Sequence, residues 1–168
     1  MNDPIFSKSL IYICEHDKDG SMGLIINKPM ISENAADIIQ QTGLAQINPL
    51  PDIYFGGPVN LEMGLILHNA SYTIEGTLSI SKSVALTSNK KIVADLKNGD
   101  GPSEFRFSFG YACWGKGQLE REIENGDWLL QASNIKLLFD IPSEEIWEHA
   151  TKSLGININD ISNIGGMA

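Results

Sequence analysis

The sequence predicts a single α+β domain over residues 1–168, with a mixed sheet of about seven or eight strands and about four helices. Three observations predict this class. The chain has 168 residues, the length of one domain. Short apolar segments of strand length recur along it, separated by segments with helical periodicity. Hairpin-like neighbours also mix with helical connections, which favours α+β over a regular βαβ winding.

The first segments predict a hairpin followed by a helix. Residues 10–14 form an apolar run typical of a strand buried on both faces, and residues 22–27 form the returning strand. Residues 33–42 carry apolar side chains at helical spacing. Ser32 is the expected cap at the start of this helix, and Gly43 is placed to end it.

The middle of the chain predicts more strands and a second helix. Residues 53–55 and 63–67 are short apolar segments of strand type. The Ser/Thr-rich residues 77–87 predict one or two strands with an exposed face. Ser88 is expected to cap a helix that reaches residue 98 and stops at Gly99.

Residues 104–109 alternate strictly between phenylalanine and other residues. The pattern predicts a half-exposed strand with three phenylalanines on the buried face and Arg106 and Ser108 on the exposed face. Arg106 could bind an anion there, although a surface arginine that packs its stem is the favoured interpretation. The later segments are expected to be a glycine-rich connection at 110–117, a helix at 118–125, a strand at 128–133, a helix beginning at Ser143 and an irregular tail at 156–168.

Composition and charge exclude several classes of protein. Apolar residues make up 42% of the chain and charged residues 20%, as in ordinary globular domains. No apolar run approaches the roughly 18 residues of a membrane span, and the acidic N-terminus with its early proline is not a signal peptide. Two cysteines give neither a disulfide framework nor zinc-type spacing, which predicts a cytoplasmic location.

The charge balance disfavours direct binding to nucleic acid. Twelve Lys and Arg face 21 Asp and Glu, so the formal net charge is −9. Affinity for nucleic acids comes largely from basic groups that neutralise phosphates. The chain has no basic run longer than Lys90-Lys91.

Residues 110–117 match the phosphate-binding pattern G-x-x-x-x-G-K up to its last position. Gly117 stands where a hydroxyl must reach a magnesium ion, and Tyr111 and Trp114 are bulky where backbone amides must surround a phosphate. The favoured interpretation is a glycine-rich turn anchored by two aromatic side chains.

Cys14 and His16 form the second candidate, because alternate residues of a strand share a face about 7 Å apart. The pair could be an activated thiol or half of a metal site. No nearby second pair completes a metal set, and His68 and His149 are distant in sequence. A buried, unreactive cysteine beside a hydrogen-bonded histidine is the favoured alternative. The sequence predicts no metal and no cofactor.

Several motifs together resemble the YqgE/AlgH family of small bacterial proteins. They occur in the expected order and cover nearly the whole chain: Asp3-Pro4-x-Phe6, Cys14-Glu15-His16, residues 20–29, Gly56-Gly57-Pro58-Val59, Gly64 with Leu67-His68, residues 110–120, Asn125 with Trp128-Leu129, Trp147 with Ala150, and Leu154-Gly155-Ile156. The resemblance implies an α+β domain with a mixed, partly curled sheet. One family member is labelled a transcriptional regulator of alginate production, and the family supplies no agreed catalytic residues.

The chain departs from the family pattern at a few positions. Cys113 stands where glycine is expected, Lys116 where proline is expected and Met167 where a histidine is usual. The short apolar segment that the family carries before Asp3 is not seen, which raises the hypothesis that a first strand is missing.

Two functional hypotheses follow from these motifs. The first is a cytoplasmic regulatory or interaction protein without catalysis, acting indirectly on transcription through an unknown protein partner. The second is a small-molecule-binding protein or enzyme, with Tyr111 and Trp114 as pocket walls. Both use one set of candidate residues: Cys14, His16, Asn27, Gly56, Gly57, Pro58, His68, Tyr111, Trp114 and Gln118. The sequence predicts no membrane association and no particular oligomeric state.

Overall fold

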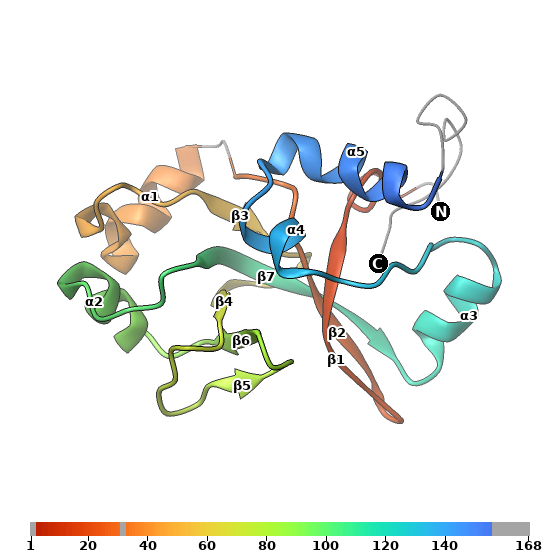
Figure 1. Cartoon of the computed structure of the whole chain (residues 1–168), viewed down its shortest axis with the longest axis horizontal. Helices are drawn as coiled ribbons and strands as arrows, with labels where there is room; N and C mark the ends of the chain where they lie inside the picture. The colour runs from red at the N-terminus through yellow and green to blue at the C-terminus, as the bar shows by residue number, and fades with distance from the viewer. Residues whose placement is uncertain (1–2, 31–32, 156–168) are drawn as a thin grey trace.

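The computed structural model describes residues 3–30 and 33–155. Within these ranges, seven strands form one curled sheet in the order β1-β2-β7-β4-β6-β5, with β3 also paired to β7 (Figure 1). The strands are β1 (Ile11–Asp17), β2 (Gly20–Ile25), β3 (Ile53–Phe55), β4 (Val59–Asn69), β5 (Leu78–Ser79), β6 (Val84–Thr87) and β7 (Phe105–Gly115). The β3–β7 pair is parallel and the other pairs are antiparallel, so the predicted α+β class with a mixed sheet is confirmed.

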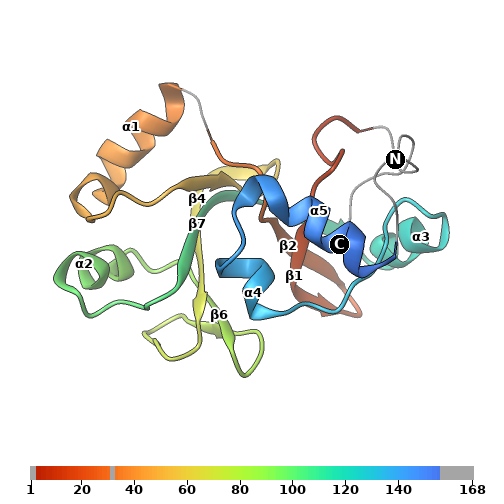
Figure 2. The same ribbon diagram turned by 45° about the horizontal axis from the view of Figure 1, so that its top comes forward.

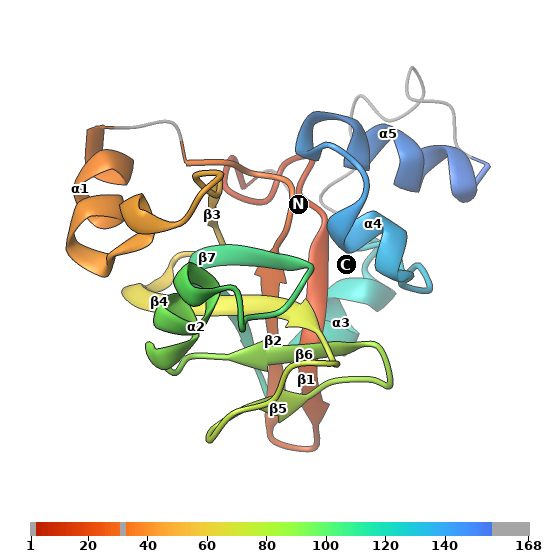
Figure 3. The ribbon, with the colours of Figure 1, turned by 60° about the vertical axis from the view of Figure 1, so that its left-hand side comes forward.

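The described part of the chain also forms five α-helices, and a short 3₁₀ helix (Leu44–Gln46) follows the first of them. The helices are α1 (Glu33–Thr42), α2 (Lys91–Asn98), α3 (Gln118–Glu124), α4 (Ile135–Phe139) and α5 (Ser143–Ser153). Helices α1 and α2 lie at one end of the molecule and α3 at the opposite end, with α4 and α5 between them (Figures 1 and 2). Figure 3 shows α1 and α5 well separated above the sheet.

The strand β7 is the centre of this arrangement. Its first half pairs with β3 on one edge and β4 on the other, and its second half pairs with β2. Gly110 lies between the halves with a positive φ of 73°, a conformation that disfavours residues with a Cβ. The prediction of a glycine-rich connection at residues 110–117 is therefore wrong, because the strand continues through the glycine to Gly115.

The turn between β3 and β4 crosses β7 at van der Waals distance. A Cβ on Gly57 would lie 2.1 Å from the backbone carbon of Tyr111, and one on Gly110 would lie 2.3 Å from the Gly57 oxygen. Gly56 makes a similar approach, with a would-be Cβ 2.3 Å from the Gly110 oxygen. These glycines let two backbone segments meet where side chains would hold them apart.

The first half of β7 is buried on both faces, and the predicted exposure of Arg106 and Ser108 is wrong. Phe107 and Phe109 belong to the core cluster under α1 and α2. On the other side, Arg106 is 6% exposed and Ser108 fully buried, because α4 and the segment after β2 cover that face. The strict alternation of residues 104–109 correctly assigned the side chains to the two faces of the strand. It did not show that both faces are covered.

Other differences concern short elements. The predicted strand at 128–133 is not formed, and the next element after α3 is the short helix α4. The Ser/Thr-rich segment forms the two strands β5 and β6 as predicted; Ser79 of β5 is exposed, whereas all four residues of β6 are buried. Asn89, and not Ser88, caps α2 by accepting a hydrogen bond from the Lys91 amide at 3.0 Å. Ser32 and the predicted tail at 156–168 lie outside the described residues.

The crossing at Gly57 predicts an unequal cost for two Gly→Ala substitutions. Gly57→Ala should lower the free energy of unfolding by roughly 3 kcal/mol or more, because backbone of β7 must move away. Gly76→Ala is the matched control: Gly76 also has a positive φ, 83°, but open space around its Cβ position, so the cost should be about 1 kcal/mol. Urea unfolding of both variants measures the difference, and equal costs would contradict the close crossing.

Candidate functional site

Cys14 and His16 are separated by a β-bulge. The register between β1 and β2 shifts between Ile13 and Glu15, which turns the two side chains to opposite sides of the strand. Cys14 packs in the core beside Leu24, and its thiol donates to the Tyr12 carbonyl at 3.6 Å. Burial raises the pKa of Cys14 to about 12, the opposite of an activated thiol.

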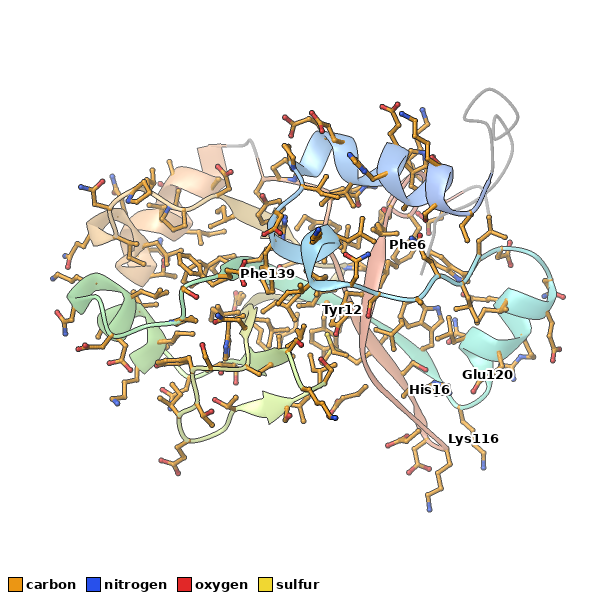
Figure 4. All side chains as sticks on the ribbon, viewed as in Figure 1. Phe6, Tyr12, His16, Lys116, Glu120 and Phe139 are labelled. Atoms are coloured by element: carbon orange, nitrogen blue, oxygen red, sulfur yellow. The ribbon has the colours of Figure 1, made fainter. Side chains whose placement is uncertain are left out.

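His16 instead faces α3. Its Nδ1 lies 2.7 Å from the Ser21 hydroxyl and its Nε2 lies 3.6 Å from a carboxylate oxygen of Glu120. Figure 4 shows His16 and Glu120 approaching each other from β1 and α3. Hydroxyl, imidazole and carboxylate occur in the order of a hydrolase triad. Ser21, however, is only 7% exposed, so the hydroxyl is closed to a substrate, and the three groups link α3 to the hairpin.

Trp114 and Gln118 hold α3 in place. A single carboxylate oxygen of Glu122 accepts from the indole of Trp114 at 2.8 Å and from the indole of Trp128 at 2.7 Å. Gln118 donates to the other oxygen of the same carboxylate at 2.9 Å. The two indole rings pack edge to face, with centroids 5.8 Å apart. The two indole rings of this cluster are therefore buried, and the polar groups are hydrogen-bonded to one another.

Asn27 and His68 are also occupied by internal hydrogen bonds. Asn27 accepts from the Leu10 amide and donates to the Lys8 carbonyl, both at 2.8 Å. The fully buried His68 lies 2.8 Å from the Thr87 hydroxyl through Nε2 and 2.9 Å from the Asn69 carbonyl through Nδ1. Burial lowers the pKa of His68, which favours a neutral imidazole.

The ten candidate residues therefore do not gather in one patch. His16, Trp114 and Gln118 lie around α3. Gly56, Gly57 and Tyr111 lie at the backbone crossing, with Pro58 exposed beside it. Cys14, Asn27 and His68 occupy three further places.

A cavity of about 650 Å³ lies elsewhere, where the chain before β3 faces the start of β7. Phe139 borders it from α4 (Figure 4). The lining is mixed, and five of its fifteen residues have polar or charged side chains: Asn48, Asp52, Tyr54, Ser103 and Arg106. The remaining lining residues, besides Phe139, are Ile47, Pro49, Leu50, Pro51, Leu96, Gly99, Gly101, Pro102 and Phe105.

Arg106 is the buried charge of this cavity. Its Nε and Nη2 donate to the Leu138 carbonyl at 3.0 and 2.8 Å, and its Nη1 donates to the Ile26 carbonyl at 2.8 Å. Its guanidinium carbon lies 4.2 Å from the centre of the Tyr54 ring, within cation–π range. Burial lowers the pKa of Arg106, and the neighbouring Tyr54 and Asp52 oppose that shift.

The alternating pattern of residues 104–109 predicted a surface position for Arg106, and no sequence pattern pointed to Asp52 or Tyr54. No local signal could have found the burial of Arg106, because the Leu138 and Ile26 carbonyls reach it from segments distant in sequence.

A second hollow of about 450 Å³ lies between β1 and α3. His16 and Glu120 stand at its edge, and the interior is apolar. Of the predicted pocket residues, only His16 lines it. Within the described ranges, no cluster of three or more His, Cys, Asp or Glu is arranged to hold a metal ion, and no helix combines the length and apolarity needed to cross a bilayer.

Comparisons with known proteins all point to one family. The family model described as AlgH-like matches residues 1–159. A UPF0301 protein of Saccharophagus degradans is 41% identical over all of this chain and 83% of its own length, and one of Dechloromonas aromatica is 37% identical over all of this chain and 91% of its own. The solution structure of AlgH from Pseudomonas aeruginosa superposes with a TM-score of 0.77 at 33% identity, covering 100% of this chain and 90% of that one. A crystal structure from Corynebacterium diphtheriae shares the fold, with a TM-score of 0.71 at 22% identity and coverage of 91% and 81%.

Because the Glu122 carboxylate accepts hydrogen bonds from both indoles, we predict that it stabilises the fold. Glu122→Ala should lower the free energy of unfolding by about 2–4 kcal/mol, because two indole N–H groups lose their acceptor. Glu124→Ala on the same helix is the control and should change it by less than about 0.5 kcal/mol, since Glu124 is exposed. Urea unfolding followed by tryptophan fluorescence compares them. Equal stability of the two variants would contradict the structural role.

Proposed function

This chain belongs to the AlgH-like family, and from that premise we propose that it is a non-catalytic regulatory protein that binds a small molecule in the cavity beside Arg106. The observation that carries the proposal is the cavity itself. Its volume of about 650 Å³ suits a metabolite-sized ligand, and its lining combines apolar walls with five polar or charged side chains that can fix a ligand's orientation.

Binding without catalysis is supported by the state of the reactive side chains. The Cys14 thiol is buried with a raised pKa, and His68 is enclosed between two hydrogen-bond partners. Ser21 is buried beneath α3. These three groups, each of which could act as nucleophile or base, are thus engaged in the fold, whereas the cavity is lined by recognition groups.

A regulatory role is supported by how the cavity is assembled. Its walls come from the loop before β3, the segment after α2, the first residues of β7 and the end of α4. A ligand in contact with all of these would stabilise their relative positions by its binding free energy. The net charge of −9 supports an indirect action on transcription over direct contact with DNA.

A thermal-shift screen against nucleotides, divalent metals and common metabolites tests the proposal. A ligand at one hundred times its Kd stabilises by about 2.7 kcal/mol, which should raise the Tm by roughly 5–10 °C. Leu50 is 57% exposed and lines the cavity, so Leu50→Trp should reduce the shift by filling the ligand's space.

Leu61→Trp is the matched control, because Leu61 is 52% exposed but lies on β4 outside the cavity lining. It should leave the shift unchanged. A ligand whose thermal shift is unchanged by Leu50→Trp, or a panel in which no compound raises the Tm, would contradict the proposal and favour a protein partner instead.

A further inference from the structure

The Asp52 carboxylate in the same cavity acts on the positive charge of Arg106 electrostatically but forms no salt bridge with it. The three hydrogen bonds of Arg106 all go to backbone carbonyls, which carry dipoles but no net charge. Among the described residues, no carboxylate forms a salt bridge with it. A buried cation is costly unless it is paired, so this charge is a place where an anion gains most from binding.

The guanidinium is fixed before any ligand arrives. The Leu138 and Ile26 carbonyls hold it from two sides, and the Tyr54 ring lies against it. These bonds use three of the five N–H donors of an arginine. A side chain held in this way loses little rotamer entropy on binding, and its planar shape matches a carboxylate.

One part of the cavity wall suits an apolar ligand body, although Asn48 and Ser103 also line the cavity. Phe105, Phe139 and Leu96 line it together with Pro102. Polyphosphate sites instead gather several cations or a helix N-terminus around the ligand. Here Arg106 is the only cation in the lining, and Asp52 is nearby, so the local charge suits one negative charge better than two.

We propose that the ligand of this cavity is a small organic monocarboxylate whose carboxylate lies against the guanidinium of Arg106 and whose apolar body lies between Phe105 and Phe139. The inference rests on the proposed function, since it names the ligand chemistry of the same cavity. Asp52 lies at the cavity surface and limits the affinity for more highly charged anions by repulsion.

Titration with three probes followed by ¹⁵N NMR tests the inference. Benzoate carries the carboxylate on an apolar ring, benzamide is its neutral counterpart, and inorganic phosphate carries more charge without an apolar body. We expect benzoate to shift the Nε–H resonance of Arg106 saturably at millimolar concentration. Benzamide should bind at least about tenfold more weakly because it lacks the charge-assisted pair. Phosphate should bind at least about tenfold more weakly because it lacks the apolar contact.

Three variants that leave Arg106 untouched sharpen the test. Leu50→Glu adds a negative charge at the cavity and should weaken benzoate at least about threefold, whereas Leu61→Glu adds the same charge outside the lining and should leave the Kd unchanged. Asp52→Asn should lower the Kd for benzoate roughly two- to fivefold, because it removes the repulsion between the Asp52 carboxylate and that of benzoate.

Each contrary result has a separate meaning. Benzamide binding in the cavity as tightly as benzoate would overturn the carboxylate inference and leave the proposed function standing. Tighter binding of phosphate would overturn it in favour of a phosphorylated ligand. If no probe shifts Arg106, the monocarboxylate inference fails, and the proposed function then stands or falls on whether Leu50→Trp blocks a hit from the metabolite panel.

Discussion

The structure depends on one constraint, the close crossing of two backbone segments at Gly57 and Gly110. Because the two segments touch without side chains between them, β7 can pair with β3 and β4 in its first half and with β2 in its second half. The sheet curls around this strand, and both faces of the first half of β7 become interior. The burial of Arg106 follows from that position, since the strand that organises the sheet also carries its charged residue into the core.

The family motifs and the cavity have different tasks. The glycines near residues 56 and 110 permit the crossing, and the two tryptophans fix α3 through Glu122. These residues are distinctive in sequence because backbone geometry and indole hydrogen bonds accept few substitutes. The cavity is lined by ordinary residues from several segments, and only the fold brings them together around Arg106.

Local signals in the sequence predicted most of the fold. The hairpin, the bounds of α1 and the left-handed Gly99 at the end of α2 all follow from short-range patterns, and the structure confirms them. What could not be predicted depends on distant contacts. The bulge at Cys14 arises from register with β2, and one extra residue was enough to separate Cys14 from His16. The five-residue helix α4 is too short to show a helical period. Burial of Arg106 depends on α4 and the Ile26 carbonyl, both far away in sequence.

The central claim is that the motifs serve the fold while the cavity serves the function. The most direct measurement is an amide chemical-shift map of the whole protein with a ligand found by screening. The account predicts that the largest shifts fall at residues 47–54 and 99–106, which line the cavity. Largest shifts at residues 14–16 and 111–118 would contradict it, because they would place binding on the motif residues that the structure assigns to folding.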